Sequence, residues 1–356
     1  MPRRKRGPLT VAVTGASGYI GSRLVEALAA DERLERVLGF DVRPPRLTSE
    51  KIVFDEIDVR NPALESRFRG VDVVVHLAFV MDPIKEEAVM RDINVHGSHN
   101  VFWSAGKAGV GKIVYTSSAT VYGAHPDNDL PLTEESPLRA NLDFSYPAHK
   151  LEVEYVVKEF REEFPKTTVT LLRPAIVFGP NVDNAWSHFL ELPVLFGVRG
   201  YEPPWQFVHE DDVADALRFA VLDADLDGPY NLAPRGWVTT DELLRVVGRQ
   251  RVEMSEPAAF ALAERLWELG LGEGPAGMLH YVMHPWVVSV DKLAAAGFEC
   301  TRTSMDAFAP VAERARDYVR LGTRRVRRAS LARGAAATLG LVSAAAAIRT
   351  ARRRSA

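Results

Sequence analysis

Short hydrophobic runs alternate with segments of helical periodicity through the first half of the chain. LTVAVTG at 9–15 is typical of a buried central strand, because parallel strands covered on both faces have no polar side. The expected strands are 9–15, 36–41, 51–58, 71–78, 112–118 and 168–180, and the expected helices are 19–30, 62–69, 84–108 and 143–164. This alternation predicts an α/β fold with a doubly wound parallel sheet covered by helices on both faces.

The pattern loosens after about residue 180, where prolines and glycines separate shorter helical segments. Helices are expected near 187–196, 211–223, 240–250 and 257–269. We therefore expect a lead at 1–8, a sheet domain at 9–180, a smaller mixed lobe at 181–322 and a tail at 323–356. Some segments of the lobe, such as 205–233, are expected to return to the sheet domain.

Composition excludes several classes of protein. The 356 residues are 47% hydrophobic and 26% charged, which is ordinary for a globular chain and excludes a mainly disordered, collagen-like or coiled-coil protein. The single cysteine, Cys300, excludes an internal disulfide and a zinc site built from cysteines. A reducing compartment, the cytoplasm, is expected.

Charge is concentrated at the two ends. Residues 3–6 carry +4 and residues 323–356 carry +9, so a whole-chain charge of −3 leaves −16 for the residues between. An acidic body lacks the basic surface that nucleic acid binding requires, and no nucleic acid partner is expected. The uncharged stretch 334–348 would form about 22 Å of helix, too short for a bilayer core of about 30 Å. It fits either a membrane-surface helix between arginines or a solvated tail.

A glycine-rich turn follows the first strand. Its glycines, Gly15, Gly18 and Gly21, have the spacing G-x-x-G-x-x-G between a strand and a helix. Such a turn lets the backbone approach a pyrophosphate, and the helix N-terminus offers free N–H groups to it. The context predicts a Rossmann-type dinucleotide site. Asp41 ends the second strand, where a carboxylate can bind ribose hydroxyls and repel a 2′-phosphate, so NAD is favoured. NADP remains the alternative, because Arg43 can neutralise that phosphate.

Tyr146 and Lys150 are four positions apart on a predicted helix and therefore share one face. An ammonium beside a phenol favours the phenolate, so the pair is expected to lower the pKa of Tyr146 toward neutrality. Tyr146 would then exchange a proton with a substrate hydroxyl. Ser118 follows another strand and is expected to bind the same oxygen. An exposed tyrosine–lysine pair is the alternative interpretation.

Together these motifs resemble the extended short-chain dehydrogenase/reductase family, in its branch of NAD-dependent epimerases and dehydratases. The matching segments are TGASGYIG (14–21), DV (58–59), HLA (76–78), NVHGSHNV (94–101), SSATVYG (117–123), YPAHK (146–150), RPAIVFGP (173–180) and FVHEDDVADAL (207–217). The resemblance implies a catalytic trio of Ser118, Tyr146 and Lys150. Dimerisation through 84–108 and 145–164 is also implied, as is substrate selection by the C-terminal lobe.

The resemblance assigns further residues to the cofactor. Asp58 and Val59 would flank the adenine, Leu77 and Ala78 would line the dinucleotide path, and Asn94 would order the site. The remaining cofactor contacts are expected at Ser17, Tyr19, Ile20, Ser117 and Pro174.

Departures from the family pattern bear on the substrate. Dehydratases place an acidic pair after a threonine where this chain has Ala119-Thr120. Nucleotide-sugar enzymes often have asparagine at the position of Ile176, and arginine where this chain has Trp205-Gln206. These replacements suggest a less charged small-molecule substrate, with Ile176 and Trp205 as candidate substrate contacts.

The expected function is NAD-dependent hydride transfer at a secondary alcohol or ketone carbon. The alternatives are a nucleotide-sugar epimerase with tightly bound NAD and a non-catalytic dinucleotide-sensing or RNA-associated protein. HEDD at 209–212 suggests a metal cluster, but adjacent residues cannot all reach one ion, so no metal is expected. Asp211 or Asp212 is expected to cap the following helix. His149 is expected at the surface or in packing.

Overall fold

A parallel sheet forms the centre of the molecule in the computed structural model, which describes residues 7–321 and 324–328. Its strands are β1 (Leu9–Thr14), β2 (Leu34–Asp41), β3 (Ile52–Glu56), β4 (Val73–His76), β5 (Lys112–Thr116), β6 (Thr168–Pro174) and β10 (Gly228–Leu232). They lie in the order β10-β6-β5-β4-β1-β2-β3, and all pairings are parallel. The order reverses between β1 and β4, so the crevice at their carboxyl ends is the expected ligand site.

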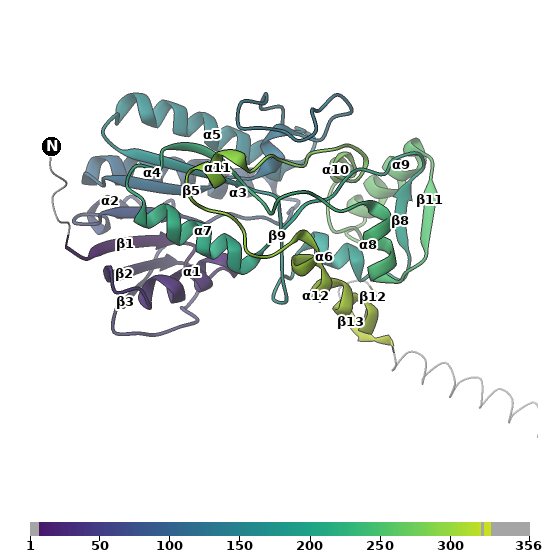
Figure 1. Cartoon of the computed structure of the whole chain (residues 1–356), viewed down its shortest axis with the longest axis horizontal. Helices are drawn as coiled ribbons and strands as arrows, with labels where there is room; N and C mark the ends of the chain where they lie inside the picture. The colour runs from purple at the N-terminus through teal and green to yellow at the C-terminus, as the bar shows by residue number, and fades with distance from the viewer. Residues whose placement is uncertain (1–6, 322–323, 329–356) are drawn as a thin grey trace, which may run out of the picture.

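Helices cover both faces of the sheet (Figure 1). Helices α1 (Tyr19–Ala29) and α7 (Glu210–Leu222) pack together on one face. Helices α2 (Leu64–Arg67), α4 (Gly97–Ala108) and α5 (Ser145–Glu163) cover the other. Successive side chains of β1 point to opposite faces of the sheet, so they belong to two hydrophobic cores. Val11 and Val13 pack toward α1 and α7, whereas Ala12 packs toward α4 and α5. The expected doubly wound fold is confirmed.

A smaller lobe lies beyond one end of the sheet, at the right of Figure 1. Its main elements are α6 (Ala185–Leu190), β8 (Leu195–Val198), α8 (Thr240–Val247), β11 (Arg251–Met254), α9 (Glu256–Glu268), η3 (Ala276–Leu279), α10 (His280–Met283) and α12 (Ser304–Asp317). Strands β8 and β11 pair in parallel. Helix α11 (Asp291–Ala295) packs near β10, and β12 (Tyr318–Leu321) pairs with β13 (Arg324–Arg327). Between the lobe's segments, the chain returns to the sheet domain as α7 and β10.

Three segments differ from the sequence-based expectation. The helix expected near 187–196 ends at Leu190, and Leu195–Val198 form the strand β8 instead. The strand expected at 168–180 divides at Ala175, and its second part, β7 (Ile176–Phe178), leaves the main sheet to pair with β9 (Phe207–His209). The helix expected at 84–108 consists of α3 (Glu87–Arg91), a π-helical segment η1 (Asp92–His96) and α4. Hydrophobic spacing cannot show the division at Ala175, because β7 pairs with a strand about thirty residues later.

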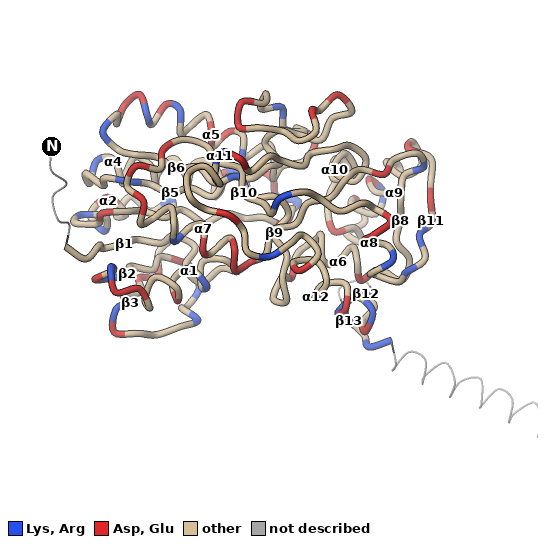
Figure 2. The backbone as a smooth tube through the Cα atoms, viewed as in Figure 1, with Lys and Arg blue, Asp and Glu red and all other residues tan. Residues whose placement is uncertain are grey.

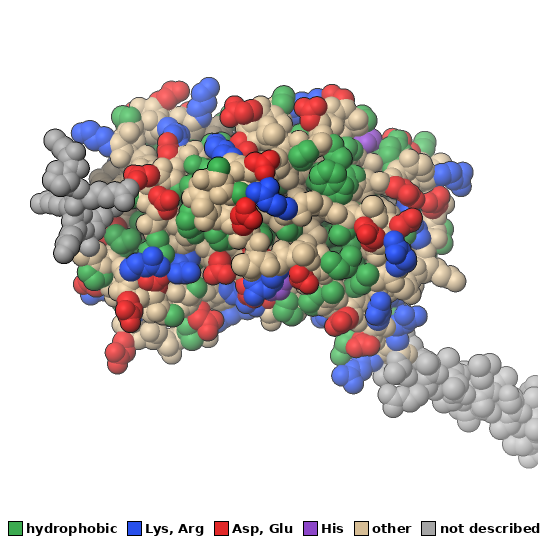
Figure 3. All heavy atoms as spheres, in the orientation of Figure 1, with side chains coloured by type: hydrophobic (Ala, Val, Ile, Leu, Met, Phe, Trp, Pro, Cys, Tyr) green, Lys and Arg blue, Asp and Glu red, His purple; other side chains and the backbone are tan. Residues whose placement is uncertain are grey.

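Charged side chains of both signs are interspersed along the described chain (Figure 2). On the face in Figure 3, the largest group of hydrophobic side chains lies over the lobe, near α10. No helix among residues 7–321 and 324–328 is long and hydrophobic enough to cross a membrane. The basic residues 3–6 and the tail segment 334–348 lie outside the described residues.

Candidate active site

The glycine turn between β1 and α1 lies against the segment that follows β4. Gly15 has a φ of +72°, and a Cβ there would lie 2.7 Å from the Ala78 nitrogen. A Cβ on Gly21 would collide with the Gly15 carbonyl. Both positions therefore need glycine for close backbone packing, and the turn presents the uncapped N-terminus of α1. This cradle fits the pyrophosphate of a dinucleotide.

Asp41 lies beside the same turn at the end of β2. Its Oδ2 accepts from the Ser17 nitrogen at 3.0 Å, and its Oδ1 accepts from the Arg43 nitrogen at 3.0 Å. The Arg43 Nε is 3.5 Å from Oδ1, while most of the Arg43 side chain is exposed. The Ser17 hydroxyl donates to the Arg43 carbonyl at 2.9 Å. The carboxylate and the guanidinium thus lie together where a ribose would bind.

This arrangement predicts coenzyme preference. Asp41→Asn is expected to raise the ratio of NADP affinity to NAD affinity about tenfold, because it removes a charge that repels the 2′-phosphate and leaves Arg43 in place. Arg43→Ala should shift the ratio the other way. Titration of both variants with each dinucleotide measures the ratio, and an unchanged ratio in both would contradict the assignment of Asp41.

Four other predicted cofactor residues have different surroundings. The Asp58 carboxylate binds Arg60 at 2.7 and 2.9 Å, and this pairing lowers its pKa. Val59 is buried against Gly97. Tyr19 begins α1, and its hydroxyl donates to Glu210 of α7. Ile20 packs in the core between α1 and α7.

Asn94 is completely buried in η1. Its Oδ1 accepts from the Val80 nitrogen at 2.7 Å, and its Nδ2 donates to the Val80 carbonyl at 3.0 Å. His149 lies 3.4 Å from the same Nδ2. These bonds connect the segment after β4 to η1 and, through His149, to α5. The role of Asn94 in ordering the site stays a prediction. His149 is buried and serves packing, so a surface position is wrong.

Ser118 and Tyr146 meet at the carboxyl end of β5. The Ser118 Oγ accepts from the Thr120 nitrogen at 3.2 Å and from the Thr120 hydroxyl at 2.9 Å. The hydrogen of Ser118 is therefore free to point elsewhere. A hydrogen bond between Ser118 and Tyr146 lowers the Tyr146 pKa, but burial raises it more, to about 12.

Lys150 lies one helical turn beyond Tyr146 and is buried. Its Nζ donates to the Thr116 carbonyl at 2.8 Å and lies 3.6 Å from the ring centre of Phe79. Burial lowers the pKa of Lys150 to about 7. The expected fall in the Tyr146 pKa is thus wrong for the protein without its cofactor, because desolvation disfavours the charged form of both groups.

Phe79 connects the two halves of the site. Its ring is 5.8 Å from that of Tyr146, and it follows Ala78, the residue against which Gly15 packs. Leu77 donates its backbone N–H to the Thr14 carbonyl at 3.1 Å. The segment 77–79 therefore joins the glycine turn to the tyrosine and the lysine.

A buried ion pair supports the lysine helix, and the sequence analysis missed it. Glu154 lies one turn beyond Lys150 and accepts from Arg173 of β6 at 2.9 and 2.5 Å. The Ser117 hydroxyl donates to Glu154 at 2.5 Å, so Ser117 braces the helix. Arg173 also donates to Tyr122 at 2.8 Å. Charged residues at core positions of a strand and a helix were the available signal. The adjacent Pro174 is buried at the end of β6, with no polar contact to assign.

The HEDD segment caps its helix differently from the expectation. His209 is the N-cap of α7, and its side chain accepts from the Asp211 nitrogen at 3.2 Å. Asp211 and Asp212 therefore lie in the first turn, and neither is the cap. Asp212 instead accepts from the backbone and hydroxyl of Thr301. Among the described residues, no group of acidic, histidine or cysteine side chains could hold a metal ion.

Ile176 and Trp205 line one cleft in the lobe, with a volume of about 90 Å³. We call it the apolar cleft, because its lining includes the hydrophobic side chains Ile176, Phe178, Trp186, Phe189, Leu190, Leu195, Phe196, Trp205, Phe207, Leu243, Leu244, Val247, Val282 and Phe308. Gln206 is buried outside it, bonded to backbone groups of Pro234, Gly236 and Val288.

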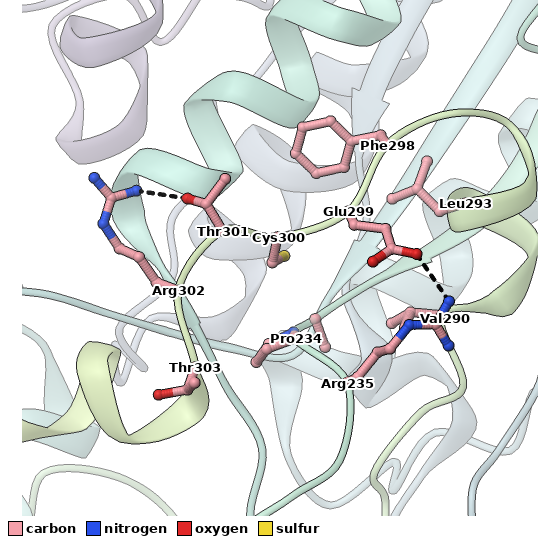
Figure 4. A pocket seen from close by; sticks show the side chains of 11 residues that line it. Pro234, Arg235, Val290, Leu293, Phe298, Glu299, Cys300, Thr301, Arg302 and Thr303 are labelled. Carbon is pink, nitrogen blue, oxygen red and sulfur yellow. Dashed lines mark hydrogen bonds and ion pairs between the residues drawn. The ribbon is translucent and has the colours of Figure 1, made fainter.

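A second cavity, of about 200 Å³, lies between the β10–α8 connection and the segment before α12 (Figure 4). Its charged side chains are already paired, Arg235 with Glu299 at 2.9 Å and Arg302 with Asp211 at 3.1 Å. Burial raises the pKa of the Cys300 thiol to about 12, so it is a poor nucleophile. This cavity has no evident chemistry.

Comparisons with known proteins agree with the fold and with the dinucleotide-binding turn described above. A model of the NAD dependent epimerase/dehydratase family matches residues 11–233. An uncharacterised protein of Mycobacterium tuberculosis is 30% identical over 264 residues, 72% of this chain and 70% of the relative. MoeE5 in complex with UDP-glucuronic acid and NAD has a TM-score of 0.69 at 22% identity, over 85% of this chain and 98% of that chain. A UDP-glucuronic acid 4-epimerase from Bacillus cereus in complex with NAD has a TM-score of 0.65 at 16% identity, over 86% and 100%. The two structures share the fold.

Proposed function

Because this chain belongs to the NAD-dependent epimerase/dehydratase family, as its motifs indicated, we propose that it is an oxidoreductase acting on a secondary alcohol or its ketone. Ser118, Tyr146 and Lys150 are the proposed catalytic residues. The observation that carries the proposal is the convergence of this trio with the glycine turn through segment 77–79. Gly15, Gly21 and Asp41 fit a dinucleotide, and bound NAD would supply the hydride acceptor or donor.

Each residue of the trio has a distinct proposed role. Ser118 has one hydrogen to donate, since Thr120 already occupies its acceptor sites. That hydrogen bonds Tyr146 in the described structure and would turn to the substrate oxygen when substrate binds. Tyr146 takes the hydroxyl proton during oxidation and returns it during reduction. Lys150, held by the Thr116 carbonyl, positions a positive charge behind the phenol whenever it is protonated. Thr120 is neutral and bonded to Ser118, which leaves no acid pair for dehydration at Ala119-Thr120.

The pH profile tests this proposal. With the pKa of Tyr146 near 12, the phenolate fraction rises about tenfold per pH unit at lower pH, so alcohol oxidation should increase with pH. Ketone reduction uses the protonated phenol, so Tyr146 adds no pH dependence below its pKa. Only the loss of charge on Lys150, whose pKa is about 7, is expected to lower the reduction rate as pH rises. We suggest measuring nicotinamide absorbance with a panel of secondary alcohols and ketones, with NAD and NADP, from about pH 6 to 9. An oxidation rate independent of pH would contradict the role of Tyr146.

A nucleotide-sugar epimerase with tightly bound NAD is the second candidate, and the B. cereus neighbour carries that name. Purified protein that retains NAD and interconverts a nucleotide sugar without net NADH formation would favour it. A protein that binds NAD and turns over neither class of compound would favour the non-catalytic alternative. Self-association through 84–108 and 145–164, the division into domains, and peripheral membrane contact by the tail stay predictions.

A further inference from the structure

The apolar cleft lies between elements of the lobe and the strand pair β7–β9. Ile176 starts β7, Trp186 and Phe189 belong to α6, and Leu244 and Phe308 come from α8 and α12. Helices α6, α8 and α12 are neighbours in Figure 1, and α12 also contacts β7. The space in it that a water-sized sphere can reach is about 90 Å³, which is smaller than the sites of drug-sized ligands, about 300–1,000 Å³, so a short group is the occupant that fits.

The polar groups that line the apolar cleft are already bonded. Trp205 donates its indole N–H to the Thr240 hydroxyl at 3.0 Å, and Thr240 donates to the Pro203 carbonyl at 3.1 Å. The Tyr201 hydroxyl donates to Glu256 at 2.7 Å. Water in such a cleft finds few partners, so an apolar occupant displaces it favourably.

Charge in the apolar cleft is also compensated. Among the described residues that line it, Arg251 is the one charged side chain. Its guanidinium lies 3.4 Å from Glu202 and 3.6 Å from Glu253, and it donates to the Tyr201 carbonyl at 3.2 Å. A diphosphate placed here would lose its hydration without gaining an unpaired cation.

The apolar cleft and the catalytic tyrosine border one hydrophobic cluster. Tyr146, Trp186 and Trp205 all pack against the cluster that contains Ile176 and Phe308. The Ala185 nitrogen, at the start of α6, donates to Asp82 at 3.2 Å. Asp82 lies three residues beyond Phe79, the ring that contacts Tyr146. Ser118, Tyr146 and Lys150 do not themselves line the apolar cleft, so the shared cluster and the Asp82–Ala185 bond are what connect the two.

We propose that the substrate is a secondary alcohol or ketone with an uncharged hydrocarbon or aromatic arm, and that the apolar cleft binds this arm. The inference rests on the proposed hydride transfer and adds the substrate class. It excludes a nucleoside diphosphate as the group bound in the apolar cleft.

The test uses 2-alkanones and the matching 2-alkanols of about four to ten carbons. Each methylene buried should raise kcat/KM about threefold to fourfold until the apolar cleft is full. Calorimetric titration with the 2-alkanones should show the same dependence in dissociation constants, without requiring turnover. Trp205→Ala and Trp186→Ala, which alter two different walls, should each flatten this dependence. Trp237→Ala is the matched control, because Trp237 is 41% exposed and lies outside the apolar cleft.

The outcomes separate the two proposals. Chain-length-dependent affinity without turnover would support the apolar cleft and contradict hydride transfer. Turnover without chain-length dependence, or with the dependence unchanged in both tryptophan variants, would overturn the apolar cleft and leave hydride transfer standing. Turnover of UDP-glucose with neither binding nor turnover of the 2-alkanones would also overturn the proposed role of the apolar cleft. If Trp205→Ala does not fold, Trp186→Ala decides alone.

Discussion

Tyr146→Phe is expected to lower kcat by a factor of about 10²–10⁴ while the dissociation constant for NAD changes less than about threefold. The substitution removes one hydroxyl and keeps the ring that packs on Phe79. The substrate oxygen then loses its proton acceptor during oxidation and its proton donor during reduction. Stopped-flow measurement of nicotinamide absorbance gives kcat, and titration of the protein with NAD gives the dissociation constant.

Tyr155→Phe provides the matched control, because Tyr155 lies on the same helix and is 54% exposed. It should leave kcat unchanged. If Tyr146→Phe retained the activity of the unmodified protein, another group would have to carry the proton, and the proposed mechanism would fail.

Glu154→Gln is expected to lower the free energy of unfolding by about 3–5 kcal/mol. Arg173 would remain buried with its positive charge unpaired, since both residues have side chains only 4% exposed. The Ser117 hydroxyl would also lose a charged acceptor. Urea denaturation followed by circular dichroism measures the change.

Glu152→Gln is the control on the same helix. Glu152 pairs with Arg91 at 2.6 Å, but these side chains are 37% and 47% exposed. Solvent screens such a pair, so the loss should be below about 1 kcal/mol. Equal losses of unfolding free energy in the two variants would show that burial does not determine how much the Glu154–Arg173 pair contributes to stability.

The sheet and the glycine turn were predictable because their signals are local. A continuous hydrophobic run predicts a covered parallel strand, and the glycines lie between that run and a helical pattern. The division at Ala175 was not predictable, because β7 leaves the main sheet only through its pairing with β9, about thirty residues later. The N-cap of α7 was missed although its bond is local, since His209 accepts from the Asp211 nitrogen two residues later. Only the bond of Asp212 to Thr301 joins a distant segment.

The candidate site was predictable in part. Tyr146 and Lys150 share a face through helix geometry alone, and Ser118 follows a strand whose carboxyl end faces the crevice. The bonds of Asn94 to Val80 and of Glu154 to Arg173 were not predictable, because each joins two separate elements. The predicted direction of the Tyr146 pKa shift was wrong for the same reason, because burial is a property of the packed protein.

The sequence by itself determined the parallel sheet, the dinucleotide turn and the spacing of tyrosine and lysine, because neighbouring residues fix hydrophobic periodicity and helical geometry. Only the tertiary structure brought Ile176 and Trp205 together. Pairing of Ile176 with Phe207 places Trp205 two residues from that contact, and the lobe helices close around both. A cleft is bounded by side chains from several elements, so its shape and polarity follow from packing rather than from any one segment.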